Sequence, residues 1–499
     1  MLRNFIISSL LTCLSVMCSA ATGTWNSPVA GTVSYTSNKA TNARKDYNGK
    51  LFTVVYLENL GFDKVGQNTN AEDVKWLRDN GFAVIEIDYK NNAKAVSPYI
   101  NQDIIALNAE LNKGTFCGIS GISTKRAYIL FEGYRIQTDV SYYLDDPSVY
   151  NYPDNYKTTK GDSLYMDIIY PANASKSVPA LLSFSYSNSY GQKSSASAVG
   201  ENAHLRMYLP YTLACGTFYD SILEGAPARG IAWAIADHPK YCEWGQGKRT
   251  GGANKEYASI ATNPDAASKV KSAVRTLRSI GASLNLSGEI GIYGFSRGST
   301  TGSLAVGDMR VEDFENSTRG RFLGTNSRVQ AAILGPGVFD YTLLADGFTD
   351  KNEYRNAVKV WGEMQSNFST WQLQGASYLV ETNASAPCLF FYNSDDEGFY
   401  AKCADAMKAK LDAIGVKTEL IKDFRTGHCV PNDDSNLTKI YDFLCESFNT
   451  STAISLPMTE RQPSEASYDL RGIKLPGRHT STSGIHITRN RKYLSGGLR

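Results

Sequence analysis

The stretch EIGIYGFSRGSTTGSLAVG, from Glu289 to Gly307, decides the fold. Its apolar first part predicts a buried strand that ends at Gly294, and the small residues that follow predict a helix. Ser296 lies between Gly294 and Gly298 in the pattern G-x-S-x-G. Only small neighbours fit beside a serine on such a sharp strand-to-helix corner, because bulky ones would collide with the strand or the helix. The pattern therefore predicts a raised, reactive hydroxyl at Ser296.

Apolar runs on both sides of this corner extend the pattern into a sheet. The runs that predict strands are 133–143, 162–172, 179–187, 230–238, 289–294, 329–337, 386–396 and 417–424. The first two alternate like antiparallel strands, and the other six are typical of buried parallel strands with helices between them. We therefore expect an α/β fold with a mostly parallel eight-stranded sheet over residues 133–450, with a helical insertion at 338–385.

Residues 22–132 predict an extra N-terminal α/β module. Its first part, up to residue 50, is polar and rich in turn-forming residues, and alternating strands and helices follow. The predicted strands are 51–57, 82–89 and 126–133, and the predicted helices are 71–81 and 97–114. Thr69 and Glu72 have the spacing of a capping box. Three strands make a thin independent domain, so we expect the module to pack against the main sheet.

The two ends of the chain have a different composition. Residues 1–21 read as a signal peptide, with Arg3 before an apolar run and a small-residue site ending at Ala20. The run is too short and too rich in serine for a good membrane anchor, and lipid attachment at Cys18 is the minority alternative. At the other end, 451–467 has the composition of a linker and 468–499 predicts a small β segment. We expect a protein secreted to the periplasm, cell surface or medium, without stable membrane insertion.

The composition favours a globular protein and gives little support to other classes. Its net charge is only +2 over 499 residues, and the sequence has no basic stripe, so no nucleic-acid partner is expected. It shows no phosphate-binding glycine loop and no cluster of metal ligands, so no cofactor or metal is needed. Seven of the nine cysteines remain after signal cleavage, and the sequence does not decide whether they form disulfides or are buried reduced thiols.

A serine hydroxyl needs a base to remove its proton. His428, in RTGHCVP, follows the last predicted strand, where a base can reach the corner. The runner-up is His238, at the end of the fourth strand, and His204 lies in a loop. The two other histidines of the mature chain, His479 and His486, belong to the tail.

A carboxylate that orients the base should follow the seventh strand. The segment CLFFYNSDDEGFY offers Asp396 as the first choice and Asp395 as the alternative, while Asp340 after the sixth strand is a distant third. One of the two neighbouring aspartates is expected to be part of a solvated turn.

The chain resembles the α/β-hydrolase superfamily over about two thirds of its length. The likeness is carried by the corner GFSRG, the acid in NSDDE and the base in TGHC, which follow the order Ser, Asp, His. Within this superfamily, the chain looks like secreted esterases and prolyl-oligopeptidase-like hydrolases. The resemblance implies an oxyanion hole made by the backbone N–H of Arg297 and by one from Tyr186 or Ser187, although no HGGG motif is present.

Two further features bear on the substrate. Arg297 resembles the arginine of the G-x-S-R-x-G elbow in glucuronoyl esterases, with the following glycine shifted; pairing with an acid is the other interpretation. Trp244 lies in a long glycine-rich loop with Asn, Gln and Lys, a composition that suits sugar rings and equally a tyrosine-rich exported protein.

These residues favour a secreted serine hydrolase that cleaves carboxylic esters, with a substituted polysaccharide (acetyl, feruloyl or glucuronoyl ester) or a small ester as substrate. The alternatives are a prolyl-oligopeptidase-like peptidase, whose elbow would continue with Tyr-Gly-Gly, and a non-catalytic glycan-binding relative. The tail segments SYDLRGIKL and SGIHITRNRKYL resemble the sorting domains of type IX secretion, which implies export to the surface or the medium.

Overall fold

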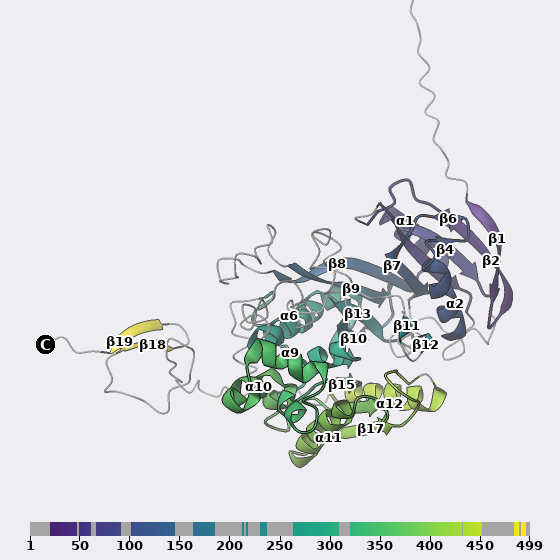
Figure 1. The fold of residues 1–499 in the computed structure, drawn as a ribbon. Helices are drawn as coiled ribbons and strands as arrows, with labels where there is room; N and C mark the ends of the chain where they lie inside the picture. The colour runs from purple at the N-terminus through teal and green to yellow at the C-terminus, as the bar shows by residue number, and fades with distance from the viewer. Residues whose placement is uncertain are drawn as a thin grey trace, which may run out of the picture. The chain divides into compact units, whose positions relative to one another are not determined.

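A computed structural model describes residues 20–46, 49–60, 66–90, 101–144, 163–184, 212–213, 216–217, 230–236, 263–308, 320–431, 433–451, 484–488 and 491–495. The chain divides into one compact unit that ends at Phe448 and a second that begins at Asn449. Figure 1 shows the elements of both units.

The first unit is built on an eight-stranded sheet. Its strands are β8 (Tyr134–Leu144), β9 (Ser163–Pro171), β10 (Val178–Phe184), β13 (Ala232–Ala236), β14 (Leu286–Gly294), β15 (Ala331–Leu334), β16 (Cys388–Tyr392) and β17 (Thr418–Lys422). They lie in the order β17-β16-β15-β14-β10-β13-β9-β8. The last six in the chain are mutually parallel, and β9 pairs antiparallel with both β8 and β13. The prediction of an α/β fold with a mostly parallel eight-stranded sheet is confirmed.

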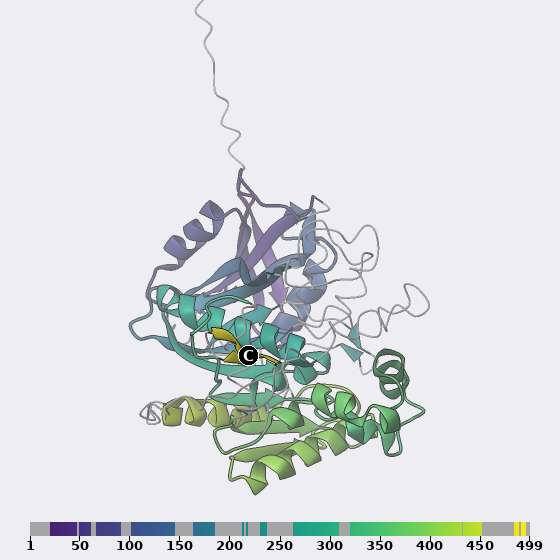
Figure 2. The same ribbon diagram turned by 90° about the vertical axis from the view of Figure 1, so that its left-hand side faces the viewer.

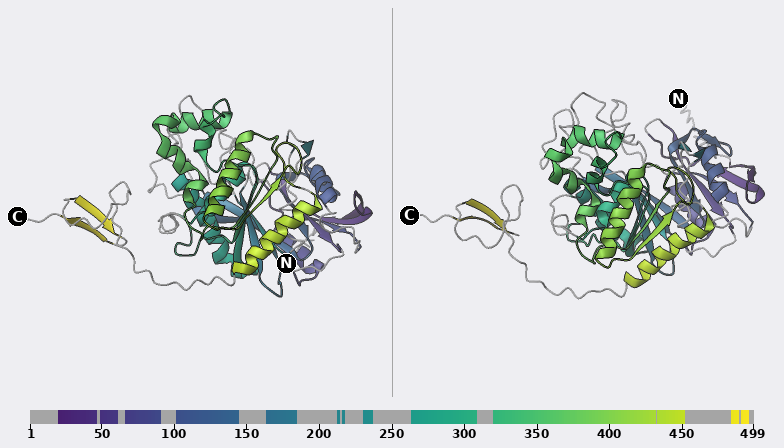
Figure 3. Two further views of the ribbon diagram at one scale, coloured as in Figure 1. Left: turned by 90° about the horizontal axis from the view of Figure 1, so that it is seen from below. Right: turned by 60° about the horizontal axis from the view of Figure 1, so that its bottom comes forward.

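Helices supply the apolar side chains that bury this sheet. They are α6 (Asn263–Gly281), α7 (Arg297–Gly302), α11 (Gly398–Ala413) and α12 (Asp434–Ser451), with short 3₁₀ turns at Ala282–Leu284 and Ser303–Ala305. Residues of α6 and α11 share one core cluster, and residues of α12 belong to the other. Figure 3 shows α11 in green and α12 in yellow-green beside the strands that they cover.

The insertion between β15 and β16 is helical, as predicted. It comprises 3₁₀ turns at Tyr341–Ala345, Met364–Ser366 and Ala376–Leu379 and the helices α9 (Asn352–Trp361) and α10 (Phe368–Gln374). Trp361 and Trp371 meet edge to face with their ring centroids 5.7 Å apart, and both are buried. Aromatic pairs of this geometry add to the apolar area that they bury, so the two tryptophans fix α9 against α10.

The larger sheet of the N-terminal module contains five strands rather than the three predicted. The elements of the module are β1 (Ala21–Ser27), β2 (Gly31–Asn38), β3 (Leu51–Glu58), α1 (Asn70–Asp79), β4 (Ala83–Asp88), α2 (Asn101–Leu111), β5 (Thr115–Phe116), β6 (Ile119–Ser120) and β7 (Ile122–Phe131). β5 and β6 form a separate short hairpin, and the order in the larger sheet is β1-β2-β4-β3-β7, drawn in purple and blue in Figure 2. The polar, turn-rich segment before residue 50 thus forms an antiparallel hairpin. Its strands are rich in Thr, Ser and Gly, and most of their residues are half-buried or exposed, so they lack the apolar alternation that marks a strand.

The capping box at the start of α1 is confirmed. The Thr69 hydroxyl accepts from the Glu72 backbone N–H at 3.2 Å, and the Glu72 carboxylate accepts from the Thr69 N–H at 2.7 Å. Two N–H groups that the helix itself cannot satisfy are thereby paired.

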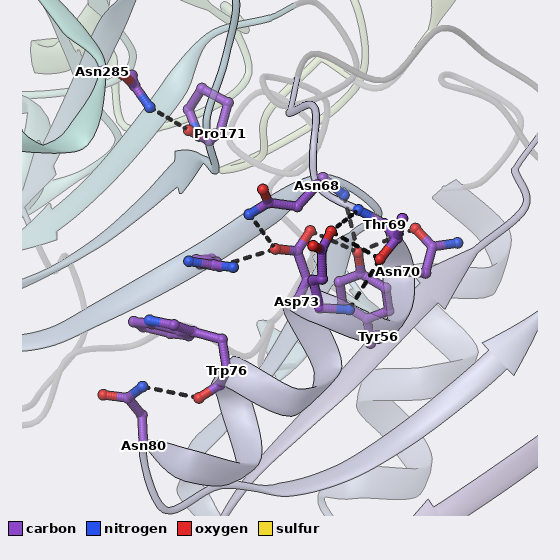
Figure 4. A network of polar contacts seen from close by, with 12 residues as sticks. Tyr56, Asn68, Thr69, Asn70, Asp73, Trp76, Asn80, Pro171 and Asn285 are labelled. Atoms are coloured by element: carbon purple, nitrogen blue, oxygen red, sulfur yellow. Dashed lines mark hydrogen bonds and ion pairs between the residues drawn. The ribbon is translucent and has the colours of Figure 1, made fainter.

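The module packs against the main sheet, as expected, and a buried ion pair fixes the junction. One core cluster contains residues of both sheets, such as Leu57 of β3 and Ile169 of β9. Asp73 of α1 is fully buried and lies 2.9 Å from the Arg135 guanidinium of β8. The Asp73 carboxylate also accepts from Asn68 at 3.1 Å and from the Tyr56 hydroxyl at 3.3 Å (Figure 4).

A second ion network lies further along the same junction. Arg126 of β7 pairs with Asp139 at 2.9 Å, and Asp167 of β9 accepts from the Tyr128 hydroxyl at 3.0 Å. Asp139 has a φ of 59°, at an irregularity in the pairing of β8, and its N–H donates to Asp167 at 2.9 Å. Side chains from the module therefore hold this bent part of the main sheet.

Glu58, at the end of β3, makes the stability of the module depend on pH. Burial, with the nearby carboxylates of Glu86, Asp88 and Glu132, raises its pKa from 4.5 to about 7. Between these values the folded chain keeps a proton that the unfolded chain releases, so this contribution to stability is present below pH 4.5 and is lost as the pH rises through 7.

We expect Glu58→Gln to raise the free energy of unfolding at pH 8 by about 1 kcal/mol, after a discount for partial exposure, and to change nothing at pH 4. Urea unfolding at both values measures this. Glu110→Gln is the control, because Glu110 pairs with Lys113 near the surface. A Glu58→Gln effect that is equal at both pH values would contradict the prediction.

The second unit contains a hairpin of β18 (Gly484–Thr488) and β19 (Arg491–Ser495), two of the three short strands predicted in the tail. Residues 468–483 and all but Ala20 and Ala21 of the predicted signal peptide lie outside the described residues. Within the described residues, no helix is both long and apolar enough to span a membrane. The cysteines described as free thiols are Cys117, Cys388, Cys403, Cys429 and Cys445.

Candidate active site

Ser296 sits on the sharp corner that its sequence predicts. Its backbone has φ 55° and ψ −125°, a combination that a residue with a side chain adopts only under strain. β14 ends two residues before it and α7 begins one residue after it. A Cβ on Gly294 would lie 2.4 Å from the Ser299 Cα, which explains the glycine at that position. Ser296 is half-buried, just beyond the end of the strand.

His428 and Asp396 come together although they are far apart in the chain. The Asp396 Oδ2 lies 2.7 Å from the His428 Nδ1. The Asp396 side chain is 7% exposed and that of His428 27%, so a shielded carboxylate meets a partly open imidazole. The other Asp396 oxygen accepts from the Glu397 backbone N–H at 2.8 Å, which fixes the carboxylate. With a proton held on Nδ1, the lone pair of the ring lies on Nε2.

The other predicted acids make different contacts, and the other predicted bases lie in the second unit or outside the described residues. The carboxylate of Asp395, next to Asp396, accepts a hydrogen bond from the Gly427 backbone N–H at 2.9 Å. Asp340 caps the 3₁₀ turn at Tyr341–Ala345 by accepting from the Thr342 N–H at 3.0 Å. His486 is in β18 of the second unit. His204, His238 and His479 lie outside the described residues.

A buried amide that no sequence motif marks links the loop of Asp396 to the loop of His428, called here the acid loop and the base loop. The side chain of Asn393, 2% exposed, donates to the Gly427 carbonyl at 2.8 Å and accepts from the Arg425 N–H at 2.9 Å. Gly427, one residue before His428, has a φ of 69°, which a glycine adopts without strain. The only signal in the sequence was a polar residue directly after an apolar strand.

Two aromatic rings contact the imidazole. The Phe295 ring centroid lies 4.7 Å from that of His428, and the Tyr400 centroid lies 5.3 Å from it. Phe295 directly precedes Ser296, so this contact brings the base loop to the corner. Among the described residues, no cluster of three or more histidine, cysteine, aspartate or glutamate side chains could hold a metal ion.

Arg297 begins α7, directly after the serine, and is half-buried. Its charge acts on Tyr400, the same tyrosine that contacts His428. Burial and neighbouring carboxylates raise the pKa of Tyr400, while the Arg297 guanidinium opposes that rise. The remaining predicted site residues, Tyr186, Ser187 and Trp244, lie outside the described residues.

No protein-family model matches the sequence, and no curated protein matches it. The fold is similar to solved structures of esterases. One is a truncated carbohydrate esterase from gut microbiota, with 17% identity over 64% of this chain and 98% of that chain, and a TM-score of 0.42. Others are an acetyl ester-xyloside bifunctional hydrolase from Caldicellulosiruptor lactoaceticus (16% identity, 64% of this chain and 96% of that chain, TM-score 0.41) and a thermophilic esterase from Thermogutta terrifontis (16% identity, 66% and 96%, TM-score 0.38).

Proposed function

We propose that the protein is a serine hydrolase that cleaves carboxylic esters, with Ser296 as nucleophile, His428 as general base and Asp396 as the orienting acid. The observation that carries the proposal is the 2.7 Å contact between His428 and Asp396, combined with the strained backbone of Ser296. A base oriented by a carboxylate and a serine on a strained corner form the arrangement that activates a hydroxyl.

The reaction has two steps. The Ser296 Oγ attacks the ester carbonyl carbon and its proton passes to His428 Nε2; the carbon–alkoxy bond then breaks and the alcohol leaves with that proton. Water next loses a proton to His428 and attacks the acyl-enzyme, which releases the acid and returns the proton to Ser296. The Arg297 backbone N–H, at the start of α7, is proposed as one donor to the oxyanion, and Tyr186 or Ser187 as the other.

The proposed substrate is an ester on a substituted polysaccharide. Its support comes from the sequence, where Trp244 and polar side chains share a glycine-rich loop. Export is proposed on the apolar segment at 1–21 and on the likeness of the tail to type IX sorting domains. An exported enzyme would meet polysaccharide esters that do not enter the cell.

A panel of substrates tests the reaction class. We expect the wild-type protein to hydrolyse p-nitrophenyl acetate and at least one of acetylated xylan, a feruloyl ester and a glucuronoyl ester, and Ser296→Ala to lose all of this activity. Free acid released from each ester measures the outcome. Aminoacyl p-nitroanilides are included, and cleavage of these amides alone would favour a peptidase and end the esterase proposal.

A further inference from the structure

We propose that Tyr400 is a positioning residue for the base, and that its ring together with that of Phe295 holds the imidazole of His428 in the reactive orientation. This rests on the proposed function, because it concerns the same base. Phe295 and Tyr400 are called here the aromatic pair. Neither residue follows from the serine, histidine and acid pattern of the sequence.

The contacts of the imidazole show why a second restraint is needed. The bond to Asp396 restrains Nδ1, but a single hydrogen bond leaves rotation about the χ1 and χ2 bonds of His428 only partly restricted. His428 is also 27% exposed, so close packing does not lock it from every side. The aromatic pair lies at 4.7 Å and 5.3 Å from the imidazole, with interplanar angles of 46° and 31°. Rings at these distances restrict that rotation, and their faces favour the cation that forms when Nε2 takes the serine proton.

Both members of the aromatic pair are themselves anchored. Phe295 is fully buried in the core that contains α12. Tyr400 lies in the first turn of α11 and packs against the other core, with its ring centroid 4.3 Å from that of Phe399. The base is therefore supported from both cores.

The insertion in turn fixes the first turn of α11. Lys351 pairs with Glu397 at 2.6 Å, and the Phe348 ring meets that of Phe399 at 5.8 Å. The Tyr400 backbone N–H donates to the Glu397 carbonyl at 2.9 Å. The helical insertion thus reaches the base through this turn, without contributing to the triad.

The ring of Tyr400, rather than its hydroxyl, is assigned the role. Burial and the carboxylates of Glu353, Asp396 and Glu397 keep the phenol neutral by raising its pKa. A neutral phenol contributes no titration of its own in the range where esterases are assayed. Tyr400→Phe keeps the ring and removes the hydroxyl, so it separates the two roles.

The experiment compares Tyr400→Leu, Tyr400→Met and Tyr400→Phe with p-nitrophenyl acetate as the probe. We expect the Leu and Met variants to lose about 10- to 100-fold in kcat with KM nearly unchanged, since small displacements of a catalytic group have effects of that size. The Phe variant should stay within about 2-fold of wild type, because the stacking surface is retained. Tyr378→Leu is the matched control, a half-buried tyrosine packed against the same core.

A second readout does not depend on activity. In ¹H–¹³C spectra of histidine-labelled protein, the His428 Hε1 signal, assigned with His428→Gln, should be displaced by the ring currents of the aromatic pair. It should move in Tyr400→Leu and Tyr400→Met and stay in place in Tyr400→Phe. The signal can be recorded at a lower temperature, so it also tests a variant that is too unstable for kinetic measurements at the assay temperature.

Three results would overturn the inference: unchanged kcat in Tyr400→Leu, equal losses in the Leu and Phe variants, or a rise in KM alone. The first would remove the role, the second would assign it to the hydroxyl and the third to substrate contact. Failure of the proposed function looks different, because it would appear as ester hydrolysis that survives Ser296→Ala in otherwise wild-type protein.

Discussion

Asp396→Asn is expected to lower kcat for ester hydrolysis about 10,000-fold while the protein stays folded. The amide fits in place of the carboxylate, but its NH₂ group can donate to Nδ1 and so favours the wrong tautomer of His428. It also gives no charge to stabilise the imidazolium. The measurements are kcat and KM for p-nitrophenyl acetate, with thermal unfolding as the check on folding.

The neighbouring Asp395 supplies the matched control. Its carboxylate accepts from the Gly427 N–H at 2.9 Å and is exposed, so Asp395→Asn should change kcat less than about 10-fold. The sequence left the choice between the two aspartates open. Equal losses in both variants would show that the 2.7 Å contact is not what orients the base, and a loss in Asp395→Asn alone would transfer the role of the acid to Asp395.

Asp73→Ala is expected to lower the free energy of unfolding by about 3–5 kcal/mol. Asp73 is fully buried, and its removal leaves the Arg135 guanidinium and the Asn68 amide without the oxygens that they now contact. Asp79→Ala, on the same helix, is the control. Asp79 forms an exposed pair with Lys75, so its loss should cost at most about 1 kcal/mol.

Urea unfolding of both variants measures these differences. The double variant Asp73→Leu/Arg135→Met should recover most of the loss, because it removes both charges together and replaces them with apolar side chains. The proposed active site lies at the other end of the strands, so folded Asp73→Ala should keep the wild-type kcat. A loss no larger than that of Asp79→Ala would show that the buried pair does not hold the module.

The main sheet is predictable from the sequence because its strands are long apolar runs, and Ser296 is predictable because the corner needs small residues at fixed positions. The hairpin of β1 and β2 is not predictable in this way, because its short polar side chains give no clear period. The hairpin joins the sheet through β4, which pairs with β2 across some fifty residues of the chain.

The details of the site depend on geometry that no local pattern encodes. Asp395 and Asp396 are adjacent and chemically identical, and only the turn after β16 decides which one meets His428. Tyr400 is one of thirty tyrosines, and only the fold places it beside the base. Asn393 is likewise identified only through its contacts with the base loop.

The chain order of the contacts implies an order of assembly during synthesis. The pairs that join the module to the main sheet, such as Asp73 with Arg135 and Arg126 with Asp167, all lie before Pro171, so they can close while most of the polypeptide is still unmade. β10 in contrast waits for β14, more than a hundred residues later. The nascent chain can thus close these contacts between the module, β8 and β9 before the corner at Ser296 and the later loops of Asp396 and His428 have been made.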